Sequence, residues 1–434
     1  MSSSDNASKE AASASEHSAA RSPTQPGGDN GLVYDGGARA WMTVIGGCCV
    51  TTATFGYANA FGVYQDIYTR SGAASASRIS WIGSTQLFFL MAMGLPAGKL
   101  LDMGYFRQTT LFGSVLYIFC LFMVSIAHPD QYYQIYLAQG LGMGIGAGLL
   151  YVPAVALQSH HWRRRRALAM GIVVTGSSIG GIIFPIMLNR LFEGSTGFAW
   201  GVRASGFVVL GLLVAANLLM SENRLKGEVK AAPTKPDMKA IMTDVPYLFS
   251  IVAVFFIDWG VFFPYFYLQL FSILHGVDPN IAFYTLAILN AASMPGRIIP
   301  NGLADRYGPF NAIIPCVGAC GILIFALYGI HSVATVIVFA ILYGFFSGAF
   351  LSLCAPCLAA LSSHPSEVGV RFGIAFALTG FGALTGTPIT GALLGTTLPW
   401  SKALIWSGVT ILAGMFFFIP ARQKMARRKD TQWV

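Results

Sequence analysis

Apolar and polar positions follow one another along the chain in long blocks, with twelve apolar segments separated by polar stretches. A helix that crosses the hydrocarbon core of a bilayer needs about 20 mostly apolar residues, and each segment approaches or meets that length. The first six segments lie near residues 40–64, 79–101, 109–127, 132–158, 167–189 and 204–220, and the second six lie near 246–271, 281–303, 310–330, 333–360, 372–395 and 401–420. The pattern predicts an all-α membrane protein with twelve transmembrane helices in two six-helix bundles.

The polar stretches divide the chain into five parts. Residues 1–38 are rich in Ser, Ala and Gly, so they cannot bury enough apolar surface to order, and we expect a disordered cytoplasmic tail. Residues 39–220 and 245–421 would form the two bundles. Residues 221–244 contain five Lys or Arg and two Pro, which predicts a cytoplasmic linker, and residues 422–434 would form a basic cytoplasmic C-terminus.

An internal repeat supports two pseudo-symmetric halves. Three pairs of like residues stand 203 positions apart: Asp102 and Asp305, Pro153 and Pro356, and Pro185 and Pro388. Repeats of this kind are related by an axis along the membrane normal, and they place a substrate site between the halves near the middle of the membrane. We therefore expect a binding site between the two bundles.

The positive charges give the orientation. Charged residues make up only 10% of the chain, and the predicted topology places 21 of the 27 Lys and Arg on one side and five on the other. Because short cytoplasmic loops retain Lys and Arg, both termini are predicted to be cytoplasmic. The net charge of +9 does not indicate a nucleic-acid partner, because the cations lie in loops between apolar spans.

The sequence offers little for enzyme chemistry. The seven cysteines fall inside apolar segments, where thiols behave as small hydrophobic groups. No His, Cys and Asp cluster has metal-ligand spacing, and no glycine-rich loop leads into Lys-Ser or Lys-Thr to hold nucleotide phosphates. We therefore expect no catalytic residues, metal or other cofactor, and no use of ATP.

Arg163 to Arg166 directly precede the fifth apolar segment, whose glycines and serines leave one helix face almost bare, so a neighbouring helix could approach closely or a cavity could open. Together with Asp35-Gly36-Gly37 and Trp41 before the first span, this run resembles the monocarboxylate-porter family of the major facilitator superfamily. The segment 296–308 is similar to the loop signature after the eighth span of fungal members. The resemblance covers about residues 35–421.

This resemblance implies a monomeric secondary transporter, most often of the plasma membrane, that contacts lipids and moves a small organic molecule by alternating access. Animal members carry a lysine in the first span and an aspartate one turn before the eighth-span arginine. Here Asn59 and Ala60 stand at the first position and Ser293 at the second, with Asn290 one turn further back. The missing charges favour a larger, less polar solute. Uptake of a monocarboxylate or vitamin and export of a secondary metabolite remain open, with a non-transporting membrane sensor as a remote alternative.

Arg297 is the foremost candidate for substrate binding, because a cation inside a span marks a substrate or ion pathway and can hold a carboxylate with two hydrogen bonds. A snorkelling arginine is the alternative. We hypothesise that Asp258, in the middle of the seventh span, bridges to Arg297 and provides proton coupling. Asn59, Asn290 and Tyr343 are further candidates for contact with substrate.

The remaining candidates follow from the resemblance. Arg166 and Ser177 match fifth-span positions that contact the substrate or the cytoplasmic gate. Asp102, Asp305 and Arg306 lie in loops where charges that pair with helix ends can hold the outward-facing state, so we interpret them as gating residues. Met103 stands where an arginine normally follows the first aspartate, which predicts a weaker contact there.

Overall fold

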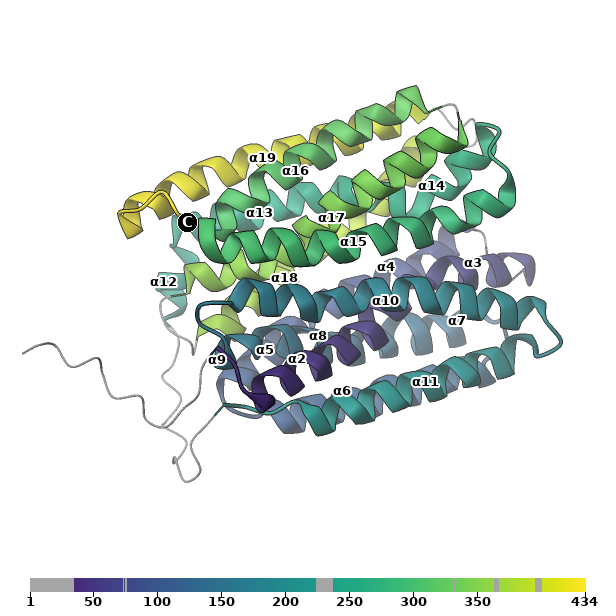
Figure 1. Cartoon of the computed structure of the whole chain (residues 1–434). Helices are drawn as coiled ribbons and strands as arrows, with labels where there is room; N and C mark the ends of the chain where they lie inside the picture. Colours follow the sequence, from purple (N-terminus) through teal and green to yellow (C-terminus); the bar gives the residue numbers. More distant parts are fainter. Residues whose placement is uncertain are drawn as a thin grey trace, which may run out of the picture.

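The computed structural model describes residues 35–72, 74, 76–223, 237–330, 332–362, 367–394 and 400–434. Most of the predicted N-terminal tail, residues 1–34, and most of the predicted linker lie outside these residues. Helices from the first half of the chain form one bundle and helices from the second half form another, side by side (Figure 1). The two-bundle prediction is therefore confirmed for the described residues.

The first bundle contains six helical segments, several of them divided. Their elements are α2 (Ala38–Thr51), the π-helix η1 (Thr52–Gly56), α3 (Phe61–Arg70), α4 (Ala76–Ala92), α5 (Gly94–Asp102), α6 (Phe106–Ile126), α7 (Tyr132–Ile135), the π-helix η2 (Tyr136–Met143), α8 (Gly144–Ala156), α9 (Gln158–His161), α10 (Arg166–Glu193) and α11 (Gly197–Leu219).

The second bundle repeats the arrangement after a short helix. Its elements are α12 (Met238–Met242), α13 (Val245–Val261), α14 (Phe263–Leu274), α15 (Pro279–Tyr307), α16 (Pro309–Ala326), the 3-10 helix η3 (Leu327–Gly329), α17 (Val333–Leu361), α18 (Val368–Leu394) and α19 (Trp400–Lys429). Ten continuous helical segments in the described residues are long and apolar enough to cross a membrane. The interrupted run from α2 to α3 and the polar α15 complete the twelve.

Three details differ from the sequence prediction. The first span contains a π-helix and is interrupted near Asn59, and the seventh is divided at Phe262. Pro264 accounts for the second break, because it lacks the N–H that would continue the α13 hydrogen-bond ladder. The last helix runs past the predicted end near residue 420 to Lys429, since the basic residues beyond Pro420 are good helix formers.

The bare face of α10 packs against the first span. A methyl group on Gly176 would lie 2.2 Å from the carbonyl oxygen of Cys48, and one on Gly180 would lie 2.5 Å from that of Thr52. Only a side chain of one hydrogen allows this approach. The sequence left open whether the glycines allow close helix packing or open a cavity, and at these positions they allow close packing.

Asp35 fixes the arginine loop that precedes α10. Its carboxylate oxygen accepts hydrogen bonds from the backbone N–H groups of Arg163, Arg164 and Arg165 at 2.9, 2.7 and 3.2 Å. The backbone N–H of Asp35 donates to the carbonyl of His161. The start of the first span is thus tied to the loop between α9 and α10, at the end of the molecule where the chain also terminates (Figure 1).

A candidate binding cavity between the two bundles

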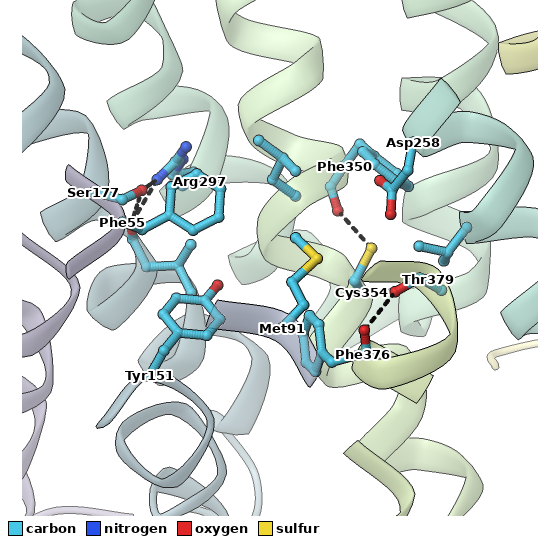
Figure 2. A pocket seen from close by; sticks show the side chains of 13 residues that line it. Phe55, Met91, Tyr151, Ser177, Asp258, Arg297, Phe350, Cys354, Phe376 and Thr379 are labelled. Carbon is cyan, nitrogen blue, oxygen red and sulfur yellow. Dashed lines mark hydrogen bonds between the residues drawn. The ribbon is translucent and has the colours of Figure 1, made fainter. Parts of the chain in front are cut away.

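A narrow cavity lies where the two bundles meet. It has about 30 Å³ of free space in this conformation, enough for one or two water molecules. A larger molecule can enter only when the bundles move apart. The lining residues come from both halves of the chain: Phe55, Met91, Tyr151, Val174, Ser177, Val254, Asp258, Arg297, Phe350, Leu351, Cys354, Phe376 and Thr379 (Figure 2).

Arg297 occupies one side of the cavity and is 1% exposed. Its guanidinium donates hydrogen bonds to the carbonyl of Val174 and the hydroxyl of Ser177, both on α10 in the opposite bundle. The phenol groups of Tyr151 and Tyr265 interact with it electrostatically, and its Nε has no hydrogen-bond partner among the described residues. The described residues also provide no acidic partner. Arg297 is a buried cation with donor capacity to spare.

Asp258 lies on the other side of the cavity, as Figure 2 shows. It sits on α13 and is 4% exposed, and Thr379 of α18 lines the same cavity. The predicted bridge between Asp258 and Arg297 is not formed in this conformation, because the guanidinium is turned toward α10. The two charged residues face one cavity from opposite sides.

Aromatic rings form the wall between the bundles. The ring of Phe55 lies 5.8 Å from that of Tyr151, and the ring of Tyr151 lies 6.1 Å from that of Phe376 in the second bundle. Phe55 belongs to the π-helix η1, an irregularity that often marks functional sites. Walls of this kind suit an apolar or ring-bearing ligand, with the few polar groups setting its orientation.

Three predicted substrate contacts lie outside the cavity wall. Tyr343 is fully buried and donates its hydroxyl to the carbonyl of Val261 at 2.7 Å. Asn59 and Asn290 flank Gly181 of α10, at the contact between the bundles. The prediction that these three residues contact substrate therefore finds no support in this conformation, whereas Arg297, Ser177 and Asp258 do line the cavity.

Asp102 and Asp305 make matching contacts across the bundles, at what we call the carboxylate end of the molecule. The carboxylate of Asp102 accepts hydrogen bonds from the N–H groups of Gly369 and Val370, at 3.1 and 2.8 Å. That of Asp305 accepts from Ala167 and Leu168, at 2.8 and 2.9 Å. Each acid thus binds the first turn of a helix in the other bundle, where the helix dipole favours negative charge.

The charges around the two aspartates differ. Arg166 lies beside Asp305 and attracts it, whereas Glu367 lies near Asp102 and repels it. Arg306 is exposed and makes no recorded hydrogen bond or ion pair within the described residues, so its predicted place in the contact is not observed here. We therefore expect the Asp102 contact to be weaker than the Asp305 contact. Glu367 repels Asp102, and Met103 stands where an arginine would otherwise follow it.

Two helix seams close the carboxylate end. The seam between α10 and α15 is polar, and in it the hydroxyls of Ser178 and Ser293 lie 2.6 Å apart. In the seam between α5 and α18, glycine packs on glycine. A methyl group on Gly98 would lie 2.0 Å from the carbonyl oxygen of Gly369. The closure of this second seam therefore depends on backbone approaching backbone.

We predict that Asp305→Asn and Asp102→Asn each weaken the closed end. Loss of a charge at a helix N-terminus costs about 1–2 kcal/mol in partly buried positions, which is roughly a five- to 30-fold change in the open-to-closed ratio. Asp305→Asn should have the larger effect, because this substitution also removes the attraction between Asp305 and Arg166. Labelling of Cys354 by an impermeant maleimide, in a variant that retains only this cysteine, would measure the opening. Equal labelling in both variants and the parent would contradict the prediction.

Several lining residues escaped prediction, among them Phe55, Tyr151 and Thr379. The repeat could have found two of them. Phe55 and Asp258 stand 203 positions apart, as do Tyr151 and Cys354, and all four line the cavity. The offset found from the aspartates and prolines thus also relates cavity positions, whereas nothing in the sequence marked Thr379.

The chain is similar to known membrane transporters. The profile of the Major Facilitator Superfamily matches residues 43–333 and 303–433. A solved structure of the proton:xylose symporter XylE superposes with a TM-score of 0.70 at 13% identity, over 88% of this chain and 95% of that chain. At that identity the match concerns the fold alone.

Fungal relatives match at higher identity. The aspyridones efflux protein of Emericella nidulans is 39% identical over 88% of this chain and 77% of its own length. The agnestins efflux protein of Paecilomyces divaricatus is 36% identical over 89% of this chain and 88% of its own. The fujikurins efflux protein of Gibberella fujikuroi is 35% identical over 91% and 85%, respectively.

Proposed function

The chain belongs to the Major Facilitator Superfamily, and on that premise we propose that it exports a fungal secondary metabolite by alternating access. The observation that carries the proposal is the cavity lined from both bundles, with a buried cation and a buried acid facing it. The relatives named as efflux proteins support export over uptake. From the resemblance to monocarboxylate porters we retain only one inference, that Arg297 binds an acidic group of the cargo.

We place the carboxylate end in the cytoplasm, at the plasma membrane. This orientation follows from the arginines at positions 163–166, which lie in the loop before α10 and at its first residue, since cations in short loops remain cytoplasmic. The described conformation would then be closed toward the cytoplasm.

Arg297 links cargo binding to movement in this proposal. In the closed conformation its donors are used across the seam, on Val174 and Ser177 of α10. An acidic group of the cargo would accept those donors instead, so binding and the polar seam compete for one guanidinium. A ligand shifts a conformational equilibrium only through such a difference in contacts.

The export proposal predicts a specific metabolite phenotype. Deleting the gene in the source organism should leave one compound accumulated in the cells and missing from the medium, as measured by untargeted metabolite profiling of both fractions. Restoring the wild-type gene should return the compound to the medium, which controls for effects on its synthesis. A compound left unconsumed in the medium of the deletion strain would indicate uptake and would contradict export.

We further propose that Asp258 couples export to inward proton movement. Cys354 of α17 is the titratable group beside it, and Arg297 faces it across the cavity. A protonophore should then slow export by the wild type, because the proton gradient drives the exchange. Export by Asp258→Asn should be slow and insensitive to the protonophore, as seen by release of the identified compound into the medium. Unchanged protonophore sensitivity in this variant would contradict the coupling.

A further inference from the structure

We propose that Asp258 and Thr379 form a second recognition subsite, which accepts hydrogen bonds from a donor group of the cargo. The cargo would then be a two-ended molecule, with an acidic group for Arg297, a hydroxyl, amide or amine donor for Asp258, and a ring-bearing apolar body between them. This inference deepens the proposed export function and rests on it.

The burial of Asp258 is the first observation. A carboxyl group inside a membrane span is costly unless it is paired, and acids retained there generally face a cavity and serve a substrate or ion pathway. Asp258 is 4% exposed, and no hydrogen bond or ion pair to its carboxyl group is recorded in the part of the chain that the structure describes. An acceptor in this position faces the cavity with its hydrogen-bonding capacity unused.

The packing of α18 against α13 brings a second acceptor to the same side of the cavity as the acid. A methyl group on Gly382 would lie 3.3 Å from Cβ of Asp258, and one on Gly386 would lie 3.1 Å from its carbonyl oxygen. This close approach brings Thr379, one turn before Gly382, to the same part of the wall. The hydroxyl of Thr379 donates to the carbonyl of Phe376 at 3.5 Å, which leaves its lone pairs free to accept.

The position of the subsite relative to Arg297 defines the class of ligand. Arg297 and Ser177 lie on one side of the cavity and Asp258 and Thr379 on the other, with Phe350 between them (Figure 2). A ligand that fits both sides therefore carries a hydrogen-bond acceptor for Arg297 and a donor for Asp258 and Thr379. Its middle part should be apolar, to match the aromatic wall. A simple monocarboxylate would satisfy only the Arg297 side.

Three related probes separate these elements. 6-Hydroxy-2-naphthoate has both ends, 2-naphthoate lacks the donor, and methyl 6-hydroxy-2-naphthoate lacks the anion. Their dissociation constants for the purified full chain in detergent can be measured by ligand-induced thermal stabilisation. The hydroxynaphthoate should bind at least about fivefold more tightly than either partial probe, since a hydrogen bond to a charged group is among the stronger kinds.

Two substitutions assign the donor preference to the subsite. Asp258→Leu should abolish the advantage of 6-hydroxy-2-naphthoate over 2-naphthoate, and Thr379→Val, which keeps the side-chain shape, should reduce it. Neither should weaken 2-naphthoate more than about twofold, which also shows that the variants fold. Thr385→Val on the same helix is the matched control, because its hydroxyl accepts from Trp259 and does not line the cavity.

The outcomes separate this inference from the export proposal. Equal binding of the two naphthoates by the wild type, an advantage that survives Asp258→Leu, or no stabilisation by any probe would overturn the subsite. The gene-deletion experiment tests export without reference to these probes. The predicted binding pattern without an export phenotype would keep the subsite and reject the export proposal.

Discussion

Gly98→Ala is expected to leave the protein folded but unable to close its carboxylate end, with export reduced roughly five- to 150-fold. The added methyl group would lie 2.0 Å from the carbonyl oxygen of Gly369, and that neighbour is backbone, which cannot rotate away. Overpacking of this kind costs about 1–3 kcal/mol, at about 1.4 kcal/mol per tenfold change. Because Gly369 belongs to the other bundle, the clash falls on the closed conformation and is relieved when the bundles part.

Two other glycines distinguish this effect from ordinary destabilisation. Gly211→Ala adds a methyl that meets nothing within 4 Å, so export should be unchanged. Gly146→Ala would place its methyl 2.9 Å from the backbone of Tyr117 inside the first bundle, so thermal stability should fall.

The measurements are release of the identified metabolite, melting temperature, and maleimide labelling of Cys354 in inside-out vesicles. Gly98→Ala should combine slow release and fast labelling with an unchanged melting temperature. Normal release by Gly98→Ala would show that the glycine seam need not close during transport.

The fold was largely predictable because bilayer thickness sets one length for every span. Twelve segments and their two groups follow from that length and from the 203-residue offset. The breaks near Asn59 and at Phe262 did not follow, because both fall within apolar stretches where no change of polarity marks them. The end of α19 was misplaced because Pro420 suggests a stop, whereas a single proline removes only one hydrogen bond from a long helix.

The candidate site was predictable where its chemistry is out of place in a membrane. Arg297 and Asp258 stood out because charge inside a span is costly, and both line the cavity. Tyr343 was predicted to contact substrate but does not line the cavity, because composition alone cannot say which helix face turns inward. Phe55 lines the cavity but was not predicted, because an aromatic residue in an apolar span is unexceptional. The repeat would have related it to Asp258.

Two buried arginines allow a sharp test of what Arg297 does. Arg371 forms an ion pair with Asp244 at 2.7 Å, and its Nε lies 3.6 Å from a carboxylate oxygen of Glu367. Arg297 has no acidic partner among the described residues, and its Nε is left without a hydrogen bond. Removing one member of a buried pair is strongly destabilising, by about 3–5 kcal/mol, because the other charge is left uncompensated. Removing a buried charge that has no counter-ion relieves a desolvation cost.

Arg297→Gln should therefore abolish export, with at least about a 100-fold loss, while the melting temperature stays the same or rises. Arg371→Gln should lower the melting temperature. Arg297→Lys should recover only part of the activity, because an ammonium lacks the planar fork that holds a cargo acid with two hydrogen bonds. A lower melting temperature in Arg297→Gln with export in proportion to the folded protein would make Arg297 a structural residue. Retained stability with lost transport would instead show that Arg297 serves binding, at a cost in stability.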